Sequence, residues 1–210
     1  MEHVLSTCKT ALTQGRYRWR HDKVLRQLAD ILERERTKKR KAQLPHGISF
    51  IKAGQSAPKQ SQVKKSILDE SDEWFMAVDL NKKLIFPDIV HTTLRPDIVI
   101  WSRKHKRLLI IELTVPWETR CEEAHERKRD KYAELQRECT TQGWRTWLFP
   151  VEVGARGFAA QSMWTLLGAL GIGGRERKRA VQSICQAAET GSSWLWLKRE
   201  ENGWKPTADT

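Results

Sequence analysis

The strongest constraint on the fold is the run RLLIIELTV at residues 107–115, which is almost continuously apolar. A strand with one face in water alternates apolar and polar residues, whereas a strand covered on both faces does not. We therefore expect this run to form a central strand with packed layers on both faces of its sheet. Glu112 is the only carboxylate in the run, so it is expected to be buried.

The segments around this strand show strand-like and helix-like patterns. Short runs of high β-propensity predict further strands at 74–80, 97–101 and 144–153. RKHK at 103–106 has the charge and length of a hairpin turn. Helices are predicted at about 15–41, 118–140, 159–170 and 175–188. This order predicts an α/β fold in which helices flank a mixed central sheet.

Two segments are expected to lie outside this core. Residues 44–66 are rich in Pro, Gly, Ser, Gln and Lys and contain one short strand-like stretch, ISFIKAG, a composition typical of a linker or a flexible loop. The tail SSWLWLKREENGWKP is expected to add an edge strand before it frays.

The chain carries a formal net charge of +12, which favours nucleic acid as a partner, with an anionic membrane surface second. No run approaches the roughly 18 apolar residues of a spanning helix, and the start of the chain is unlike a signal peptide. We therefore expect a soluble, intracellular protein. The basic residues expected to contact nucleic acid are Arg16, Arg18, Arg20, Lys23, Arg103 and Lys104, although each basic cluster taken singly is more often a solvated face.

Two acids stand at corresponding ends of neighbouring predicted strands, Asp97 at the start of one and Glu112 near the end of the next. Carboxylates at facing positions can share a divalent cation, which would lower the pKa of bound water and offset the charge of a phosphodiester. Either acid alone is more simply a turn or edge residue. The pair favours a metal site, because a carboxylate buried at Glu112 needs a cation beside it.

The spacing Pro-Asp, fourteen residues, then Glu-Leu-Thr resembles the PD-(D/E)XK nuclease superfamily, whose members carry two acids and a lysine on such a hairpin. Thr114 stands where that lysine is expected. In this respect the chain looks like the restriction-like endonuclease of site-specific non-LTR retrotransposons, in which the following helix supplies the lysine. The resemblance implies a PD-(D/E)XK core with added C-terminal helices.

The helical periodicity of residues 118–140 favours one lysine over another. At about 100° per residue, Lys128 lies in the middle of the face that holds most of the apolar residues of the helix, and Lys131 lies towards its border. Arg127 is expected to point away from this apolar face. Lys128 is the first candidate for the catalytic lysine and Lys131 the second, unless the lysine stem covers the core and leaves its ammonium group in solvent.

Supporting roles are expected for three residues near the predicted metal site, namely Thr114, Glu118 and Tyr132. Glu118 is equally well explained as an acid in the first turn of a helix, where it complements the helix dipole.

The amino terminus resembles the end of a zinc knuckle, because His3 and Cys8 have the spacing of its last two ligands. Two ligands do not make a structural zinc site, so we expect no zinc here. The resemblance divides the chain into a knuckle remnant at 1–14, a basic helix at 15–43, the loop at 44–66 and the nuclease core at 67–205. It also implies that Met1 is not a natural domain start but marks a truncation, a fragmentary copy or a gene model that lost a polymerase upstream.

The leading hypothesis is therefore a DNA nickase that uses Mg²⁺ or Mn²⁺ held by Asp97, Glu112 and the Leu113 carbonyl, with Lys128 as the cationic partner. The resemblance implies that the nick primes reverse transcription of element RNA, which places the protein in the nucleus. The alternatives are a catalytically silent module that binds nucleic acid, and a scaffold that contacts element RNA. The target site and the oligomeric state stay open.

Overall fold

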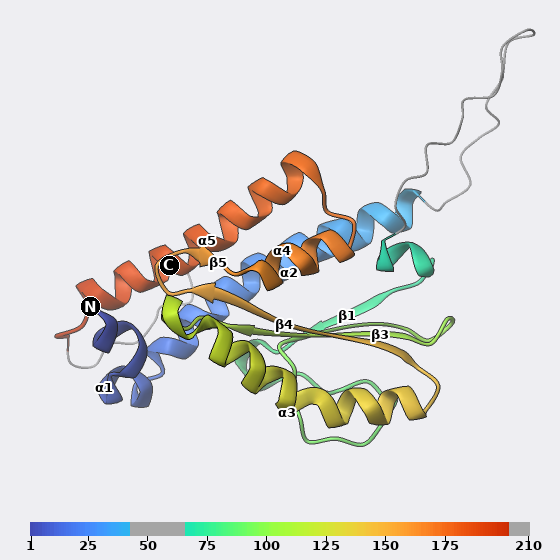
Figure 1. Ribbon diagram of the computed structural model, residues 1–210, viewed down its shortest axis with the longest axis horizontal. Helices are drawn as coiled ribbons and strands as arrows, with labels where there is room; N and C mark the ends of the chain where they lie inside the picture. The colour runs from blue at the N-terminus through green and yellow to red at the C-terminus, as the bar shows by residue number, and fades with distance from the viewer. Residues whose placement is uncertain (43–65, 202–210) are drawn as a thin grey trace, which may run out of the picture.

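The computed structural model describes residues 1–42 and 66–201 of the chain. Within these ranges it forms an α/β fold around a mixed five-stranded sheet with the order β1-β2-β3-β4-β5 (Figure 1). The strands are β1 (Phe75–Val78), β2 (Ile98–Ser102), β3 (Arg107–Thr114), β4 (Arg145–Gly154) and β5 (Phe158–Ala159). The α-helices are α1 (Lys9–Thr13), α2 (Arg16–Ala42), α3 (Cys121–Thr141), α4 (Gln161–Ala169) and α5 (Gly174–Leu197).

The middle of the sheet is the hairpin of β2 and β3, joined by the turn that the RKHK sequence predicts. The two strands pair antiparallel, with Ile98 opposite Ile111, while β4 runs parallel to β3. A parallel neighbour needs a crossover connection, and α3 provides it. All of residues 108–113 are buried, so the prediction of a central strand at 107–115 is confirmed.

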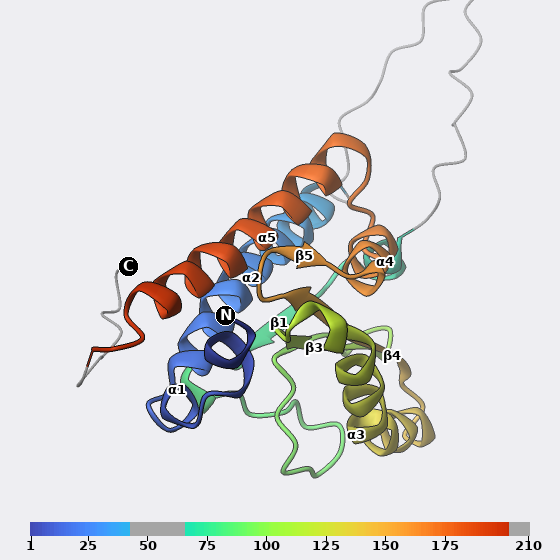
Figure 2. The same ribbon diagram turned by 60° about the vertical axis from the view of Figure 1, so that its left-hand side comes forward.

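Helices cover both faces of this sheet. Figures 1 and 2 show α2, α4 and α5 on one face and α3 on the other. Alternate side chains of β3 follow this division, because Leu109 and Ile111 join the core beneath α2, α4 and α5, whereas Leu108 and Ile110 pack with residues of α3. Glu112 lies two residues after Ile110, so its side chain points to the same face of the sheet, the one that α3 covers.

The helices match the predicted ranges in the interior of the chain and differ at its end. The predicted helix at 118–140 begins with a 3₁₀ turn, Glu118–Arg120, that leads into α3. Instead of the edge strand expected from SSWLWLKREENGWKP, residues 192–197 continue α5, so that expectation was wrong. Within the described residues, no helix combines the length and the apolar character that crossing a membrane requires.

The physical reason for the longer helix is its packing against α2. Ala188, Gly191, Ser192 and Leu195 are all buried, and their spacing of three and four residues is that of one helical face. The expected loop at 44–66 and the ISFIKAG strand fall almost entirely on residues 43–65, outside the described part of the chain.

The first residues pack onto the start of α2. A π-helical turn, His3–Thr7, precedes α1, and the hydroxyl of Tyr17 accepts a hydrogen bond from the Cys8 amide at 2.9 Å and donates one to the Val4 carbonyl at 2.9 Å. These bonds join the amino-terminal segment to the first turn of the basic helix.

Gly191 lies at a close approach of α5 to α2. A Cβ atom at this position would lie 2.8 Å from Cγ and 3.6 Å from Cα of Arg20. Alanine in a helix interior is ordinarily favoured over glycine by about 1 kcal/mol, but overpacking costs about 1–3 kcal/mol. We therefore expect Gly191→Ala to lower the free energy of unfolding by about 1 kcal/mol in urea titrations.

The exposed neighbour Ser193 supplies the control for this prediction. Ser193→Ala adds no contact with α2 and should leave the stability unchanged. A gain of stability in Gly191→Ala would contradict the close approach of the two helices.

Candidate active site

The register of the central hairpin places the two acids opposite each other. Asp97 directly precedes β2, and the pairing of Ile98 with Ile111 continues to Asp97 opposite Glu112. The Asp97 amide donates to Glu112 Oε2 at 3.1 Å, and the Leu113 amide donates to Asp97 Oδ2 at 2.8 Å. Both acids are buried, with 5% of Asp97 and 3% of Glu112 exposed. The structure thus brings together the two acids that the sequence singled out.

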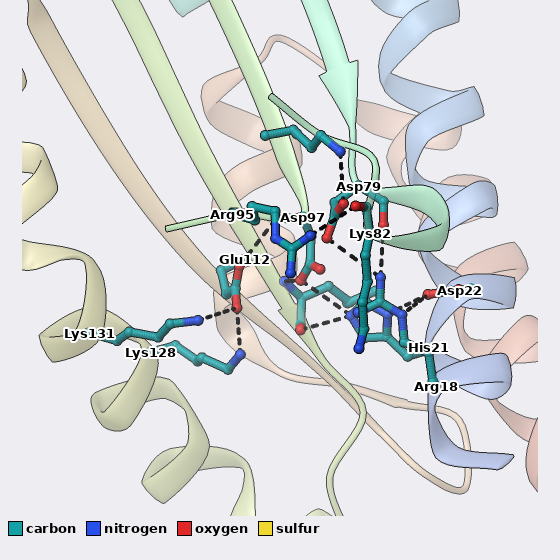
Figure 3. Close-up of polar contacts among 12 residues, drawn as sticks. Arg18, His21, Asp22, Asp79, Lys82, Arg95, Asp97, Glu112, Lys128 and Lys131 are labelled. Atoms are coloured by element: carbon teal, nitrogen blue, oxygen red, sulfur yellow. Dashed lines mark hydrogen bonds and ion pairs between the residues drawn. The ribbon is translucent and has the colours of Figure 1, made fainter. Parts of the chain in front are cut away.

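Lys128 and Lys131 of α3 both point to Glu112, and Lys128 is the closer of the two. Its Nζ lies 2.5 Å from Glu112 Oε1, and its side chain is 20% exposed (Figure 3). Lys131 Nζ is 3.8 Å from the same oxygen, and its side chain is 44% exposed. The helix face predicted from the periodicity is correct, because Ala124 and Tyr132, on either side of Lys128, are buried.

Tyr132 anchors α3 to the loop before Asp97. Its hydroxyl donates to the Arg95 carbonyl at 3.0 Å and accepts a hydrogen bond from Lys131 Nζ at 3.0 Å. Burial, followed by the negative charge of Glu112, raises the pKa of the phenol far above its usual value. Tyr132 is therefore a neutral hydrogen-bond donor that fixes the distance between the helix and the hairpin.

His21 reaches the acids from α2 and was missed by the sequence analysis. Its Nε2 lies 3.2 Å from Asp97 Oδ2 and 3.2 Å from the Leu113 carbonyl oxygen, while its Nδ1 lies 3.1 Å from Asp22 Oδ1. A signal was present, because position 21 precedes Val24 by three residues and so begins the apolar face of this helix.

The charges of the site set its protonation. Burial by itself lowers the pKa of His21, but the hydrogen bonds that its ring donates to Asp22 and Asp97, and the negative charges of these acids, raise it to about 9. Burial by itself raises the pKa of Asp97, but His21, the Leu113 amide and Lys128 hold this pKa below its usual value. Burial and the charge of Asp97 raise the pKa of Glu112, against the pull of Lys128. Asp97 is thus the acid that ionises more readily, and the ionisation of Glu112 depends on the positive charge of Lys128.

The acids open into a pocket of about 650 Å³ that lies between α2 and α3. Its lining is strongly basic and includes Arg18, Lys82, Arg95, Arg127, Lys128 and Lys131. Lys82 and Arg95 were not singled out in the sequence, because they belong to the irregular segment between β1 and β2. Arg127, expected to point away from the apolar face of its helix, is exposed as expected and also lines the pocket.

Two of the arginines expected to contact nucleic acid are instead internal. Arg16 is 2% exposed and donates to the carbonyls of Lys198 at 2.6 Å and Glu201 at 2.9 Å. Arg20 is 3% exposed and donates to Ser192 Oγ at 3.0 Å and to the Val115 carbonyl at 2.9 Å. Their guanidinium groups bind α2 to the rest of the protein, which corrects the expectation that they face a phosphate backbone.

Arg103 and Lys104 lie in the β2–β3 turn, at the opposite end of the hairpin from Asp97. Five strand residues at about 3.4 Å each separate the two ends by about 17 Å. Lys104 also forms an ion pair of 2.6 Å with Asp72. Any phosphate that these residues bind is therefore not the phosphate at the acids.

The remaining basic candidates lie on α2. Arg18 is 37% exposed at the pocket, where its Nε holds Asp22 Oδ1 at 2.9 Å. Lys23 has its Nζ 5.4 Å from the ring centre of Trp19, a cation–π arrangement. Arg18 is thus the one residue of this group that both lies at the pocket and contacts the network around His21.

Thr114 and Glu118 differ in their relation to the site. Thr114 lines the pocket, and its buried hydroxyl has no hydrogen-bond partner within the described residues. Glu118 accepts hydrogen bonds from the amide of Arg156 at 2.7 Å and from its Nε at 3.0 Å. Glu118 therefore holds the turn between β4 and β5, and within the described residues no hydrogen bond or ion pair joins it to the acids or to Lys128.

The donors that could hold a metal ion are few. In residues 1–42 and 66–201, no three or more His, Cys, Asp or Glu side chains cluster as a metal site would require. The predicted oxygen donors are nevertheless close together, because Asp97 Oδ2 and the Leu113 carbonyl both lie 3.2 Å from the same atom, His21 Nε2. A cation that lies beside the imidazole, between these two oxygens, can contact both, so the residues fit a hard divalent ion completed by water and phosphate oxygens.

Comparison of the sequence with models of known protein families and with curated proteins finds no match. The assignment of chemistry to this site therefore depends on its geometry and on the motif spacing.

Proposed function

We propose that this chain is a metal-dependent DNA endonuclease domain with a PD-(D/E)XK-like core, which nicks DNA with Mg²⁺ or Mn²⁺. The observation that carries the proposal is the meeting of two buried carboxylates and Lys128 at the end of one hairpin, in an open basic pocket. A purely structural ion pair has no need of such a pocket. The resemblance to retrotransposon endonucleases adds the proposal that the nick primes reverse transcription in the nucleus.

Each residue of the site has a role in this proposal. Asp97, Glu112 and the Leu113 carbonyl would hold the ion, which would supply an activated water and offset phosphate charge. Lys128 places its ammonium group beside Glu112, where it can also stabilise the charge that develops on the attacked phosphate. Arg95, at the rim of the pocket, can bind flanking phosphates without reading the sequence.

A supercoiled-plasmid nicking assay tests this function. We expect the wild-type chain to convert supercoiled plasmid to the open circle with Mg²⁺ or Mn²⁺, and EDTA to stop the conversion. Asp97→Ala removes the acid that ionises most readily and should abolish nicking. Asp72→Ala is the matched control, because Asp72 is exposed beside Lys104 at the other end of the hairpin. Equal nicking by wild type and Asp97→Ala would show that the site assignment is wrong.

A second candidate is a nucleic-acid-binding module without catalytic activity. The observation that favours it is that cationic side chains of the chain itself contact both acids, His21 at Asp97 and Lys128 at Glu112. In this case the protein binds DNA with an affinity that falls steeply with salt concentration, and it shows no cleavage with any divalent ion.

A further inference from the structure

His21 brings a nitrogen donor to the two oxygen atoms that are best placed to hold an ion. Its Nε2 lies 3.2 Å from Asp97 Oδ2 and 3.2 Å from the Leu113 carbonyl oxygen. Two ligands at right angles about an ion, each about 2.1 Å from it, are separated by about 3.0 Å. The distances from the imidazole to these two oxygens are therefore nearly those between neighbouring ligands of one ion.

The other ring nitrogen of His21 is held as it is in metal-binding histidines. Nδ1 lies 3.1 Å from Asp22 Oδ1, and Arg18 Nε fixes the same oxygen at 2.9 Å (Figure 3). Metal-binding histidines generally donate their second N–H to a carboxylate, which sets the tautomer and the orientation of the ring. Asp22 and Arg18 thus form an outer layer that leaves Nε2 facing Asp97.

An imidazole nitrogen, a carboxylate oxygen and a carbonyl oxygen repel one another unless a cation lies between them. Without a metal ion, an Nε2–H group can occupy this position and donate to both oxygens. A metal ion can replace that proton, which passes to solvent, because metal binding to histidine releases a proton. The site is partly exposed to the pocket through the 17% exposed side chain of His21, so an ion has a path of entry.

We propose that His21 Nε2, Asp97 Oδ2 and the Leu113 carbonyl form a mixed nitrogen–oxygen site that selects a first-row transition-metal dication over Mg²⁺. Mg²⁺ prefers oxygen ligands, whereas an imidazole ligand raises the relative affinity for transition metals. The inference rests on the proposed function, in that it names the class of ion for the same site. It also assigns to α2 a direct part in that site.

Direct measurement of Mn²⁺ bound to the full chain tests this proposal without any cleavage. Mn²⁺ serves as the probe because its paramagnetism allows pulsed electron paramagnetic resonance to detect ¹⁴N of a coordinated imidazole. We expect the wild-type protein with one equivalent of Mn²⁺ to show this ¹⁴N coupling. We also expect Mg²⁺ to displace the bound Mn²⁺ only in large excess.

His21→Gln and His105→Gln form the matched pair of variants. His105 follows β2 at the far end of the hairpin, where its Nδ1 lies 2.9 Å from Ser71 Oγ, so its loss leaves the acids untouched. His21→Gln should lose the ¹⁴N coupling, weaken Mn²⁺ binding by more than about tenfold and reduce the preference for Mn²⁺ over Mg²⁺. His105→Gln should match the wild type in all three measurements.

Several results would overturn the inference. Absence of ¹⁴N coupling in the wild type with Mn²⁺ bound does so whether or not any variant folds, and so does coupling that persists in His21→Gln. Failure of the proposed function is a separate outcome. If the protein nicks DNA but its bound Mn²⁺ shows no ¹⁴N coupling, the proposed function stands and the inference about His21 is wrong. If the bound Mn²⁺ shows the coupling but the protein does not nick DNA, the inference stands and the proposed function is wrong.

Discussion

Lys128→Met should reduce the nicking rate by at least about 100-fold, the effect of removing one group that stabilises charge in a transition state. It should also lower the free energy of unfolding by about 3 kcal/mol, the lower end of the cost of breaking a buried ion pair. The reason is that Glu112 is almost fully buried and its closest cation is Lys128 Nζ, at 2.5 Å. Burial and Asp97 already raise the pKa of Glu112, so removal of the lysine favours the protonated acid.

Lys131→Met is the comparison that separates the two lysines of α3. Lys131 is 3.8 Å from Glu112 and 44% exposed, so solvent screens its interaction. We expect this variant to lose less than about tenfold in nicking rate and less than about 1 kcal/mol in stability. Single-turnover nicking and urea unfolding measure the two effects. Equal losses in both variants, or full activity in Lys128→Met, would remove Lys128 from the site.

The second large effect is expected from Arg20→Met, which should lower the free energy of unfolding by about 3 kcal/mol. The side chain donates charge-assisted hydrogen bonds to Ser192 Oγ and to the Val115 carbonyl, and burial lowers its pKa to about 10, which leaves it charged at neutral pH. Methionine keeps the apolar stem but leaves both acceptors without this donor. At about 2–4 °C per kcal/mol for a chain of this size, the melting temperature should fall by about 6–12 °C.

Arg26→Met is the control for this substitution, because Arg26 is exposed on the same helix. It should leave the melting temperature almost unchanged. Below the melting temperature, Arg20→Met should bind DNA as the wild type does, as fluorescence anisotropy can measure. Weaker DNA binding by Arg20→Met with unchanged stability would show that Arg20 contacts nucleic acid and does not hold α2 in place.

The acids and the lysine could be predicted because their positions follow from local periodicity. Asp97 and Glu112 belong to one hairpin, in which the pairing register alone makes them neighbours. Lys128 follows from the spacing of apolar residues along a single helix. Neither inference needs to know how distant parts of the chain pack.

His21 could not be assigned in the same way, although its place on the apolar face of α2 was visible. Its contact with Asp97 joins residues that are 76 positions apart, through the packing of α2 against the sheet. The burial of Arg20 likewise depends on α5, which supplies Ser192 from 172 positions away. A basic residue on a helix looks the same in the sequence whether its partner is solvent, a phosphate or an internal carbonyl.

The sequence by itself determined the central strand, the facing acids and the helix face that carries Lys128, because strand and helix periods repeat over a few residues. Only the tertiary structure decided that the last turns of α5 are helical rather than a strand, since alternating WLWL suits a strand while burial of Gly191 and Leu195 against α2 favours a helix. It also decided which basic side chains contact the acids, because a charge acts over a distance, whereas direct contact depends on how segments far apart in the sequence pack together.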